Sequence, residues 1–363
     1  MNIPYENLKR LNQIFESEFE TAFKSFIESG WYILGKGLKH FENEFANYHG
    51  LNYAVGVANG LDALILSLRN NYFEAGSEVI VPSNTYIATI LSILHCQLKP
   101  VLVEPDINTY NIDPLKIEQA ITSKTVAIMP VHLYGQCCDM DKILQIAKMY
   151  NLVVIEDCAQ AHGALYKGRL SGTFGDYGAF SFYPTKNLGG LGDGGAILCN
   201  TEIVNSQLER LRNYGSAKKY YNKVVGYNSR LDELQAIFLN IKLKRLNEIN
   251  SHKRRLADIY LNNLNEQFIL PVVHPDFYHV FHIFNIRHAK RDNLRHYLAE
   301  NGISTEIHYP IAPHHQKAIS ELFKGKEFPI SEQIHNTTLS LPCSFAHTTD
   351  EVYRVVEVIN QFN

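Results

Sequence analysis

One lysine of the chain, Lys186, lies shortly before a stretch in which five of seven residues are glycine, in the segment SFYPTKNLGGLGDGG (181–195). A lysine amine can bind an aldehyde covalently, and it can accept a proton once its own charge is lost. Glycines allow the backbone to pass close to a bound molecule in conformations that other residues avoid. On its own such a lysine is most often a solvated loop residue. The hypothesis of a reactive lysine therefore depends on the groups that surround it.

Several polar or small residues follow short apolar runs elsewhere in the chain. The runs YAVGV (53–57), EVIVP (78–82) and LVVIE (152–156) have the composition of buried strands. Ligands of open parallel sheets collect at the carboxyl ends of the strands. We therefore predict that the residues after these runs surround one crevice together with Lys186. These residues are Gly60, Leu61, Tyr86, Asp157 and Gln160, and Ser181 of the apolar run at 178–183 joins them.

This set of groups fits pyridoxal phosphate (PLP). Lys186 would form a Schiff base with the aldehyde and, once displaced, would move a proton between two carbons. Asp157 would keep the pyridine nitrogen protonated by Coulomb attraction. The phosphate would bind to backbone N–H groups at Gly60 and Leu61 and to the hydroxyl of Ser181.

Each residue alone also has a purely structural interpretation. Asp157 could cap a helix, and Tyr86 could belong to the core. It is the occurrence of all these residues at successive strand ends that favours the cofactor site. No metal site is predicted, because the histidines His162, His308, His314 and His315 lack the spacing of metal ligands on a helix.

The wider pattern predicts an α/β fold with a large and a small domain. Further apolar runs at 100–104 and 125–130 alternate with amphipathic helical segments such as 61–71 and 140–150, which indicates parallel strands. The runs 178–183 and 195–200 are too close for a crossover helix, so Lys186 lies in the loop between two adjacent strands. We predict a large domain over 1–240 and a smaller α+β domain over 241–363, joined by one continuous helix within 231–263.

Composition excludes some classes of function. The formal net charge is −3, with 34 basic and 37 acidic residues, so no strong field favours nucleic acid or a membrane surface. The start MNIPYENLKR has no apolar signal core, and the chain has no long apolar run. Six scattered cysteines without a CxxC pair suggest buried thiols in a reducing compartment. We therefore expect a cytoplasmic protein.

Long motifs in the chain resemble those of a known family. EDCAQAHGA (156–164), GDYGAFSFYPTKNLGGLGDGGAI (175–197) and GYNSRLDELQA (226–236) are similar to the DegT/DnrJ/EryC1/StrS sugar-nucleotide aminotransferases, and the resemblance covers nearly the whole chain. It implies the aspartate aminotransferase-like fold (fold type I) of PLP enzymes. In that fold a large domain holds a mostly parallel seven-stranded sheet, and a smaller α+β domain lies at the C-terminus.

The resemblance also implies roles for individual residues. Lys186 is the Schiff-base lysine, Asp157 pairs with the pyridine nitrogen, and Gln160 lies near the ring hydroxyl. Tyr86 is the aromatic that stacks on the ring. The phosphate is held by Ser181 and by the turn at Gly60 and Leu61. Many relatives have Thr or Ser where this chain has Leu61, so one hydroxyl contact is absent here.

By the same resemblance the chain works as a homodimer with shared active sites. Asn228 of GYNSR would reach the phosphate of the cofactor in the partner subunit. Lys219 and Tyr221 of AKKYYNKV would meet the nucleotide diphosphate across the dimer interface, although Lys219 could also be simply solvated.

The segment around Lys186 is similar to family members that aminate C3 of a keto sugar. We expect a dTDP-3-keto-6-deoxyhexose as substrate, a dTDP-3-amino-3,6-dideoxyhexose as product and L-glutamate as amino donor, with pyridoxamine phosphate as the intermediate form of the cofactor. Tyr183, His308 and Tyr309 are expected to meet the sugar. The alternatives are a 4-keto sugar 4-aminotransferase, and a PLP enzyme without transamination or a binding homologue. Whether C4 has the gluco or the galacto configuration, and which nucleotide carries the sugar, stay open.

Overall fold

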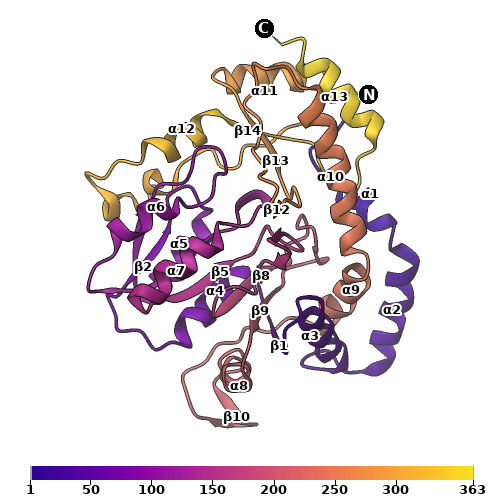
Figure 1. The fold of residues 1–363 in the computed structure, drawn as a ribbon. Helices are drawn as coiled ribbons and strands as arrows, with labels where there is room; N and C mark the ends of the chain where they lie inside the picture. Colours follow the sequence, from indigo (N-terminus) through magenta and orange to yellow (C-terminus); the bar gives the residue numbers. More distant parts are fainter. Residues whose placement is uncertain (1, 363) are drawn as a thin grey trace.

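A seven-stranded sheet forms the centre of the larger part of the protein (Figure 1). The structure is a computed structural model and describes residues 2–362. The strands lie in the order β1-β9-β8-β5-β4-β2-β3, and every neighbouring pair is parallel except the two pairs that include β9. Their bounds are β1 (Tyr53–Val57), β2 (Glu78–Pro82), β3 (Lys99–Val103), β4 (Thr125–Ile128), β5 (Val153–Asp157), β8 (Tyr177–Ser181) and β9 (Gly195–Cys199). The prediction of a mostly parallel seven-stranded sheet is confirmed.

Helices cover both faces of this sheet. Because successive side chains of a strand point to opposite faces, Val79 and Val81 pack in a core with α4 (Gly60–Arg69) and α5 (Ile87–His95), whereas Ile80 packs with α7 (Met140–Tyr150). On the same face as α7, α3 (Lys36–Tyr48) and α9 (Glu233–Leu243) cover β1, β8 and β9. The result is a three-layer α/β/α arrangement in which the apolar runs are buried on both sides.

One strand differs in its pairing from the prediction. The run at 53–57 is predicted to be a parallel strand, but β1 is hydrogen-bonded to β9 in antiparallel register, with Tyr53 opposite Cys199. The Gly-rich loop brings β9 back beside β8 and inserts it between β8 and β1. The composition of a buried strand does not reveal this, because antiparallel and parallel strands in a covered sheet have the same apolar pattern.

The C-terminal part of the chain builds a second core. Its helices and strands are α10 (Leu246–Asn263), β13 (Phe284–Arg287), α11 (Arg291–Glu300), α12 (Pro329–Thr337), β14 (Thr338–Leu341) and α13 (Thr349–Ile359). β13 and β14 pair antiparallel, and Leu256, Phe284 and Val352 belong to the core between them and the helices. Residues from the start of the chain join this part. Ile3 lies in the same core, and α1 (Leu8–Gln13) carries Arg10, which binds Glu351 at 2.7 Å. Accordingly, both termini lie at one end of the molecule (Figure 1).

The segment that joins the two parts is not one continuous helix. α9 ends at Leu243 and α10 begins at Leu246, with a break at Lys244 and Arg245. Arg245 has non-helical backbone angles and pairs with Glu248 of the following turn at 2.7 Å. The break lets α9 pack against α2 (Glu16–Ser29) and α3, while α10 packs along α13. The predicted continuous helix is therefore wrong, and the division into 1–240 and 241–363 stays a prediction.

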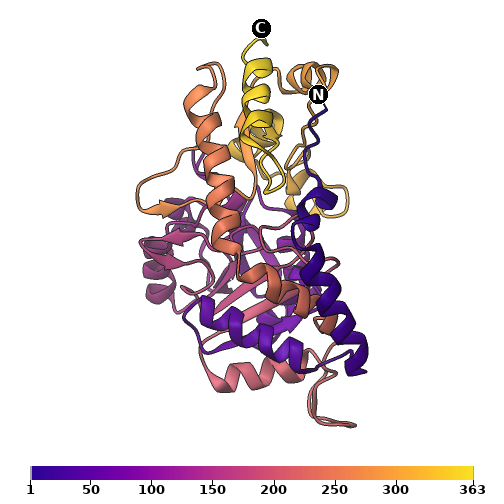
Figure 2. The same ribbon diagram turned by 90° about the vertical axis from the view of Figure 1, so that its right-hand side faces the viewer.

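A two-stranded hairpin stands away from the rest of the chain, at the end opposite the termini (Figures 1 and 2). It consists of β10 (Ser216–Lys218) and β11 (Tyr221–Asn222), and Tyr220 at its tip is 85% exposed. The remaining short elements are α6 (Pro114–Ile117), α8 (Glu202–Leu211), β6 (Leu165–Tyr166), β7 (Arg169–Leu170), β12 (Phe277–Tyr278) and the 3-10 turns at Glu118–Ala120, Leu133–Gly135, Pro313–His315 and Ser320–Phe323.

A buried ion pair fastens α3 to the edge of the sheet. The side chains of Arg212 and Glu42 bind each other where both are almost fully buried. Glu42 also accepts a hydrogen bond from the N–H of Gly56 at 2.9 Å, and Arg212 donates to the carbonyl of Gly56 at 2.7 Å. Each charge therefore compensates the other and also pairs with the backbone of β1.

We expect Arg212→Met to lower the free energy of unfolding by about 3–5 kcal/mol, because it leaves the carboxylate of Glu42 buried without its counter-ion. Urea unfolding followed by circular dichroism measures this change. The double variant Arg212→Met, Glu42→Met removes both charges and should recover much of the loss. A single variant as stable as the wild type would contradict this account of the pair.

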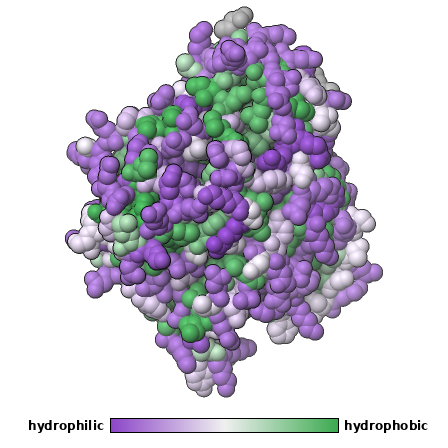
Figure 3. Space-filling view, viewed as in Figure 1, coloured by the Kyte–Doolittle hydropathy of each residue, from purple (hydrophilic) through white to green (hydrophobic). Residues whose placement is uncertain are grey.

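The surface seen in Figure 3 is mostly hydrophilic, and hydrophobic side chains gather in its upper middle, over the region of β13 and β14. Among residues 2–362, no helix combines the length and the apolarity that crossing a membrane requires. All six cysteines are free thiols and buried, and burial raises the pKa of each thiol. They are Cys96, Cys137, Cys138, Cys158, Cys199 and Cys343.

Candidate active site

A cavity of about 630 Å³ lies at the carboxyl ends of the parallel strands. Residues that follow β1, β2, β4, β5 and β8 line it, as the position of ligand sites in open parallel sheets requires. Ten residues singled out in the sequence lie in its wall: Gly60, Leu61, Tyr86, Asp157, Gln160, Ser181, Tyr183, Lys186, His308 and Tyr309. The crevice predicted from the strand ends therefore exists and contains the lysine.

Three further candidates lie outside the wall of this cavity. Lys219 and Tyr221 belong to the protruding hairpin and are exposed. Asn228 is exposed as well, and its backbone pairs with that of Asn213. Within a single chain these side chains are therefore not part of the site.

One end of the cavity is suited to an anion. Asn59 caps α4, since its side chain accepts a hydrogen bond from the N–H of Asp62 at 2.8 Å. The N–H groups of Gly60 and Leu61 donate to no acceptor among residues 2–362, and the helix dipole adds partial positive charge at this point. A Cβ atom at Gly60 would lie 2.6 Å from the Cβ of Ser181. Glycine is therefore needed to bring this helix start against the hydroxyl of Ser181.

A buried carboxylate occupies the end of β5. Asp157 accepts hydrogen bonds from the hydroxyl of Thr89 at 2.8 Å and from the N–H of Ala159 at 3.1 Å, one on each oxygen. Burial raises the pKa of Asp157, while these two hydrogen bonds and the nearby charge of Lys186 act to lower it. The two hydrogen bonds thus hold the carboxylate in a fixed orientation, and the positive charge of Lys186 stabilises its ionised form.

The amine of Lys186 is buried in the same cavity. Burial lowers the pKa of Lys186 to about 8, and the carboxylate of Asp157 opposes this shift. The amine therefore has a substantial neutral fraction near neutral pH, unlike an exposed lysine. Its Nζ atom lies 3.4 Å from Nε2 of His282.

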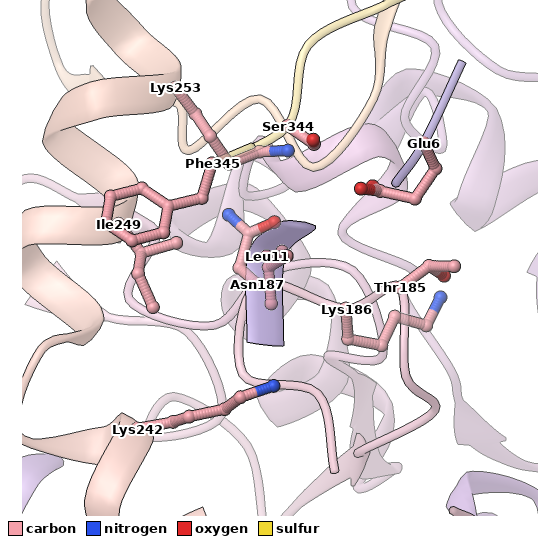
Figure 4. A pocket seen from close by; sticks show the side chains of 10 residues that line it. All are labelled: Glu6, Leu11, Thr185, Lys186, Asn187, Lys242, Ile249, Lys253, Ser344 and Phe345. Atoms are coloured by element: carbon pink, nitrogen blue, oxygen red, sulfur yellow. The ribbon is translucent and has the colours of Figure 1, made fainter. Parts of the chain in front are cut away.

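A second, small cavity lies behind the loop that carries Lys186 (Figure 4). Two more lysines reach it, from α9 and α10. The ammonium of Lys242 donates to the carbonyl of Gly189 at 2.8 Å, and that of Lys253 donates to the carbonyls of Cys343 and His282. These contacts tie the Gly-rich loop and the start of β13 to the helices that join the two parts.

Aromatic side chains also line the larger cavity. The rings of Tyr86 and Tyr309 are 5.0 Å apart, and the hydroxyl of Tyr309 accepts a hydrogen bond from Nε2 of Gln160 at 2.9 Å. Oε1 of Gln160 accepts from the N–H of Tyr134 at 2.6 Å, so the orientation of this amide is fixed. Burial lowers the pKa of His308 to about 4, so its imidazole is neutral at physiological pH.

Several residues of the site were missed in the sequence. Thr89 follows Tyr86 by three residues, so the helical spacing of NTYIAT offered a signal that both face the cavity. Asp193 and Asn59 also line the wall. His282 carries no such signal, because it stands within the apolar run VFHIF and reaches Lys186 only through the fold.

Comparisons of the sequence and of the fold with known proteins identify the family and several relatives. Residues 13–360 match the DegT/DnrJ/EryC1/StrS aminotransferase family. The chain is 56% identical over 361 residues to dTDP-3-amino-3,6-dideoxy-alpha-D-galactopyranose transaminase of Aneurinibacillus thermoaerophilus, with 99% of each chain covered. The crystal structure of DesV from S. venezuelae in complex with a ketimine intermediate matches with a TM-score of 0.96 and 41% identity, over 99% of this chain and 98% of that one. The structure of ntda from Bacillus subtilis with bound cofactor PMP gives 0.93 and 31%, over 99% and 84%.

Proposed function

The chain belongs to the DegT/DnrJ/EryC1/StrS aminotransferase family, and from this we propose that it converts a dTDP-linked 3-keto-6-deoxyhexose into the dTDP-3-amino-3,6-dideoxyhexose. L-Glutamate is the proposed amino donor. The observation that carries the reaction type is that a buried lysine and a buried carboxylate, Lys186 and Asp157, line the same cavity. The 56% identical relative is named for a galacto product, so the galacto configuration at C4 is the proposed first choice.

The cavity fits pyridoxal phosphate as cofactor. The N–H groups of Gly60 and Leu61, which have no acceptor within the described residues 2–362, and the hydroxyl of Ser181 suit its phosphate, and Asp157 suits its pyridine nitrogen. The volume of about 630 Å³ is in the range of ligand sites. When bound, PLP supplies an aldehyde that takes up the amino group and a ring that draws electrons from the neighbouring carbon.

The side chains of the protein then divide the remaining work. Lys186 holds the aldehyde end of the cofactor and, in its neutral form, takes a proton from one carbon and returns it to another. Thr89 and the N–H of Ala159 keep the carboxylate of Asp157 aimed into the cavity. The Tyr86 ring supplies an apolar wall against which a flat ring can lie.

The sugar is proposed to lie between Tyr183, His308 and Tyr309. These three residues belong to the wall of the cavity, and Tyr183 is half exposed. Neutral His308 and the phenolic hydroxyls offer hydrogen bonds to sugar hydroxyls without adding charge.

We propose that two chains form a homodimer with shared active sites. An exposed apolar strip supports this, because large apolar patches on a surface mark contacts with other proteins. It runs along α2 and the turn after it and contains Phe23, Ile27, Trp31, Tyr32 and Ile33. In the dimer, the exposed Asn228 would complete the phosphate site of the partner subunit, and Lys219 and Tyr221 of the hairpin would bind the nucleotide diphosphate. The six free thiols favour work in the reducing cytoplasm.

Mixed dimers test the shared site. Lys186→Ala damages the site within its own subunit, whereas Asn228→Asp places a carboxylate against the phosphate of the partner's site. In a mixed dimer both defects fall in one site and the other site is intact, so coexpressed variants should recover up to about half the activity of a wild-type dimer.

Two differently tagged chains, purified by both tags, give the mixed dimers for this assay. The homodimer of each single variant must be inactive. The control is a dimer in which both tagged chains carry Lys186→Ala. No recovery in verified mixed dimers would place Asn228 in the site of its own subunit and defeat the shared-site proposal.

The substrate is tested by turnover with a panel of keto-sugar nucleotides. The panel contains 3-keto and 4-keto sugars, gluco and galacto forms, and dTDP and UDP carriers, and NMR of the products locates the new amino group. We expect the 3-keto dTDP sugar to give the highest kcat/KM. Amination at C4 would replace the proposal with the 4-aminotransferase alternative.

A further inference from the structure

The imidazole of His282 is the nearest polar side chain to the amine of Lys186 for which the structure gives a contact. It comes from the segment just before β13, 96 positions along the chain, and places Nε2 at 3.4 Å from Nζ of Lys186. The other ring nitrogen, Nδ1, lies 3.4 Å from Oδ1 of Asn187. The two nitrogens of His282 thus face two consecutive residues of the Gly-rich segment.

The orientation of the Asn187 amide is fixed by its other contacts. Its Nδ2 atom lies 3.1 Å from the carbonyl oxygen of Val280 and 2.8 Å from Oδ1 of Asn250. A backbone carbonyl can only accept, so the atom that faces Val280 must be the NH₂ group. The atom that faces His282 is therefore the carbonyl oxygen of the side chain.

This orientation determines where His282 carries its proton. Oδ1 of Asn187 can only accept, so Nδ1 of His282 must be the protonated nitrogen. In a neutral imidazole Nε2 is then a bare acceptor, and it faces the lysine. We propose that His282 is a positioning residue. Its Nε2 atom accepts a hydrogen bond from the amine of Lys186 and so fixes the directions of the other N–H bond and of the lone pair of the amine.

The consequence concerns the lysine when its amine is free. A neutral amine has two N–H bonds and one lone pair, and rotation about the Cε–Nζ bond would otherwise spread that lone pair over many directions. When one N–H is hydrogen-bonded to His282, the amine has fewer orientations about the Cε–Nζ bond. It therefore loses less orientational freedom when it approaches the reacting carbon. The inference rests on the proposed function of Lys186.

The imidazole of His282 does not become protonated by the ammonium of Lys186. Burial lowers the pKa of His282 well below its ordinary value, and the nearby cations of Lys186 and Lys253 lower it further, with smaller contributions from His308 and His162. The carboxylate of Asp157 acts on the lysine and raises its pKa. The imidazole is therefore neutral near neutral pH, where its Nε2 atom can accept a hydrogen bond.

A first experiment reads the tautomer directly. The cofactor-free protein is labelled with ¹⁵N-histidine, and long-range ¹H–¹⁵N correlation spectra separate the two neutral tautomers and the cation. We expect His282, assigned by its loss in His282→Gln, to be protonated at Nδ1. In Asn187→Leu the Nδ1–H form should lose its preference. Protonation at Nε2 in the wild type would overturn the proposal without any need for an activity assay.

A second experiment measures the lysine. Competitive labelling of the cofactor-free protein with acetic anhydride, read by mass spectrometry, gives the pKa of Lys186 in the wild type, in His282→Leu and in His282→Gln. Loss of an acceptor for the ammonium should lower the pKa of Lys186 in His282→Leu by about one pH unit. Glutamine keeps an acceptor oxygen and should restore much of this shift. Equal values in all three proteins would overturn the proposal.

Kinetics with the loaded enzyme complete the test. In His282→Leu we expect kcat to fall by about tenfold with little change in KM of the donor, and His282→Gln to recover part of kcat. A leucine variant with an unchanged kcat would contradict the positioning role. If Lys186→Ala kept its turnover, the proposed function would fail, while the tautomer and the pKa would still report on the hydrogen bond itself.

Discussion

Lys186→Ala is expected to lower turnover by about four orders of magnitude or more while the chain remains folded. In the proposed mechanism the amine both holds the cofactor and carries the proton between two carbons, so its loss removes two steps at once. Lys186→Arg should be equally inactive, because a guanidinium keeps its proton at every working pH and cannot act as the base. Turnover with the keto-sugar nucleotide and L-glutamate measures the effect.

A lysine at the amino end of the strands, on the side of the sheet away from the cavity, supplies the matched control. Lys124 is exposed and precedes β4, at the amino end of the strands, so Lys124→Ala should leave turnover unchanged. Borohydride treatment gives a readout besides activity. It should attach PLP permanently to the wild type and to Lys124→Ala but not to Lys186→Ala. If Lys186→Ala retained more than a few per cent of activity, another residue would have to carry the proton.

Asp157→Asn is expected to lower turnover by about two to four orders of magnitude. The amide has nearly the same shape as the carboxylate, but it lacks the charge that, in the proposed mechanism, favours a protonated pyridine nitrogen. PLP should still bind, because the proposed phosphate site at Gly60, Leu61 and Ser181 is unchanged. The comparison of kcat with the dissociation constant of the cofactor separates these two effects.

Thr89→Val is the control for this variant, since it removes one hydrogen bond to Asp157 and keeps the charge. We expect it to cost about tenfold in turnover, in line with one hydrogen bond to a charged group. Asp157→Asn with the turnover of the wild type would mean that this carboxylate does not face the ring.

The sequence predicts those residues of the cavity that directly follow a strand. Apolar runs mark the strands, and in a mostly parallel sheet their carboxyl ends converge at one edge. Gly60, Tyr86, Asp157 and Ser181 follow from this rule, and the short distance between two runs put Lys186 in a loop at that edge. The geometry of the sheet thus carried this part of the prediction.

Other features depend on contacts between distant segments, which local patterns do not encode. The insertion of β9 between β8 and β1 is a matter of pairing, and the break at Lys244 and Arg245 interrupts a helical pattern for only two residues. His282 is separated from Lys186 by 96 positions, so only the fold brings the two together. Asn228 and the hairpin lie away from the cavity of their own chain, and a single chain leaves their role as a proposal.

The burial of the thiols has a practical consequence for labelling. All six cysteines lie within residues 2–362, each is buried, and each thiol has a raised pKa, so maleimides should react with the native protein very slowly. A cysteine introduced on the surface can therefore be labelled selectively in the wild-type chain, without prior removal of the native cysteines. A cysteine introduced at the exposed Ala217 of β10 would carry a fluorophore on the hairpin. In the proposed homodimer, energy transfer between two such labels would report how far apart the two hairpins lie during turnover.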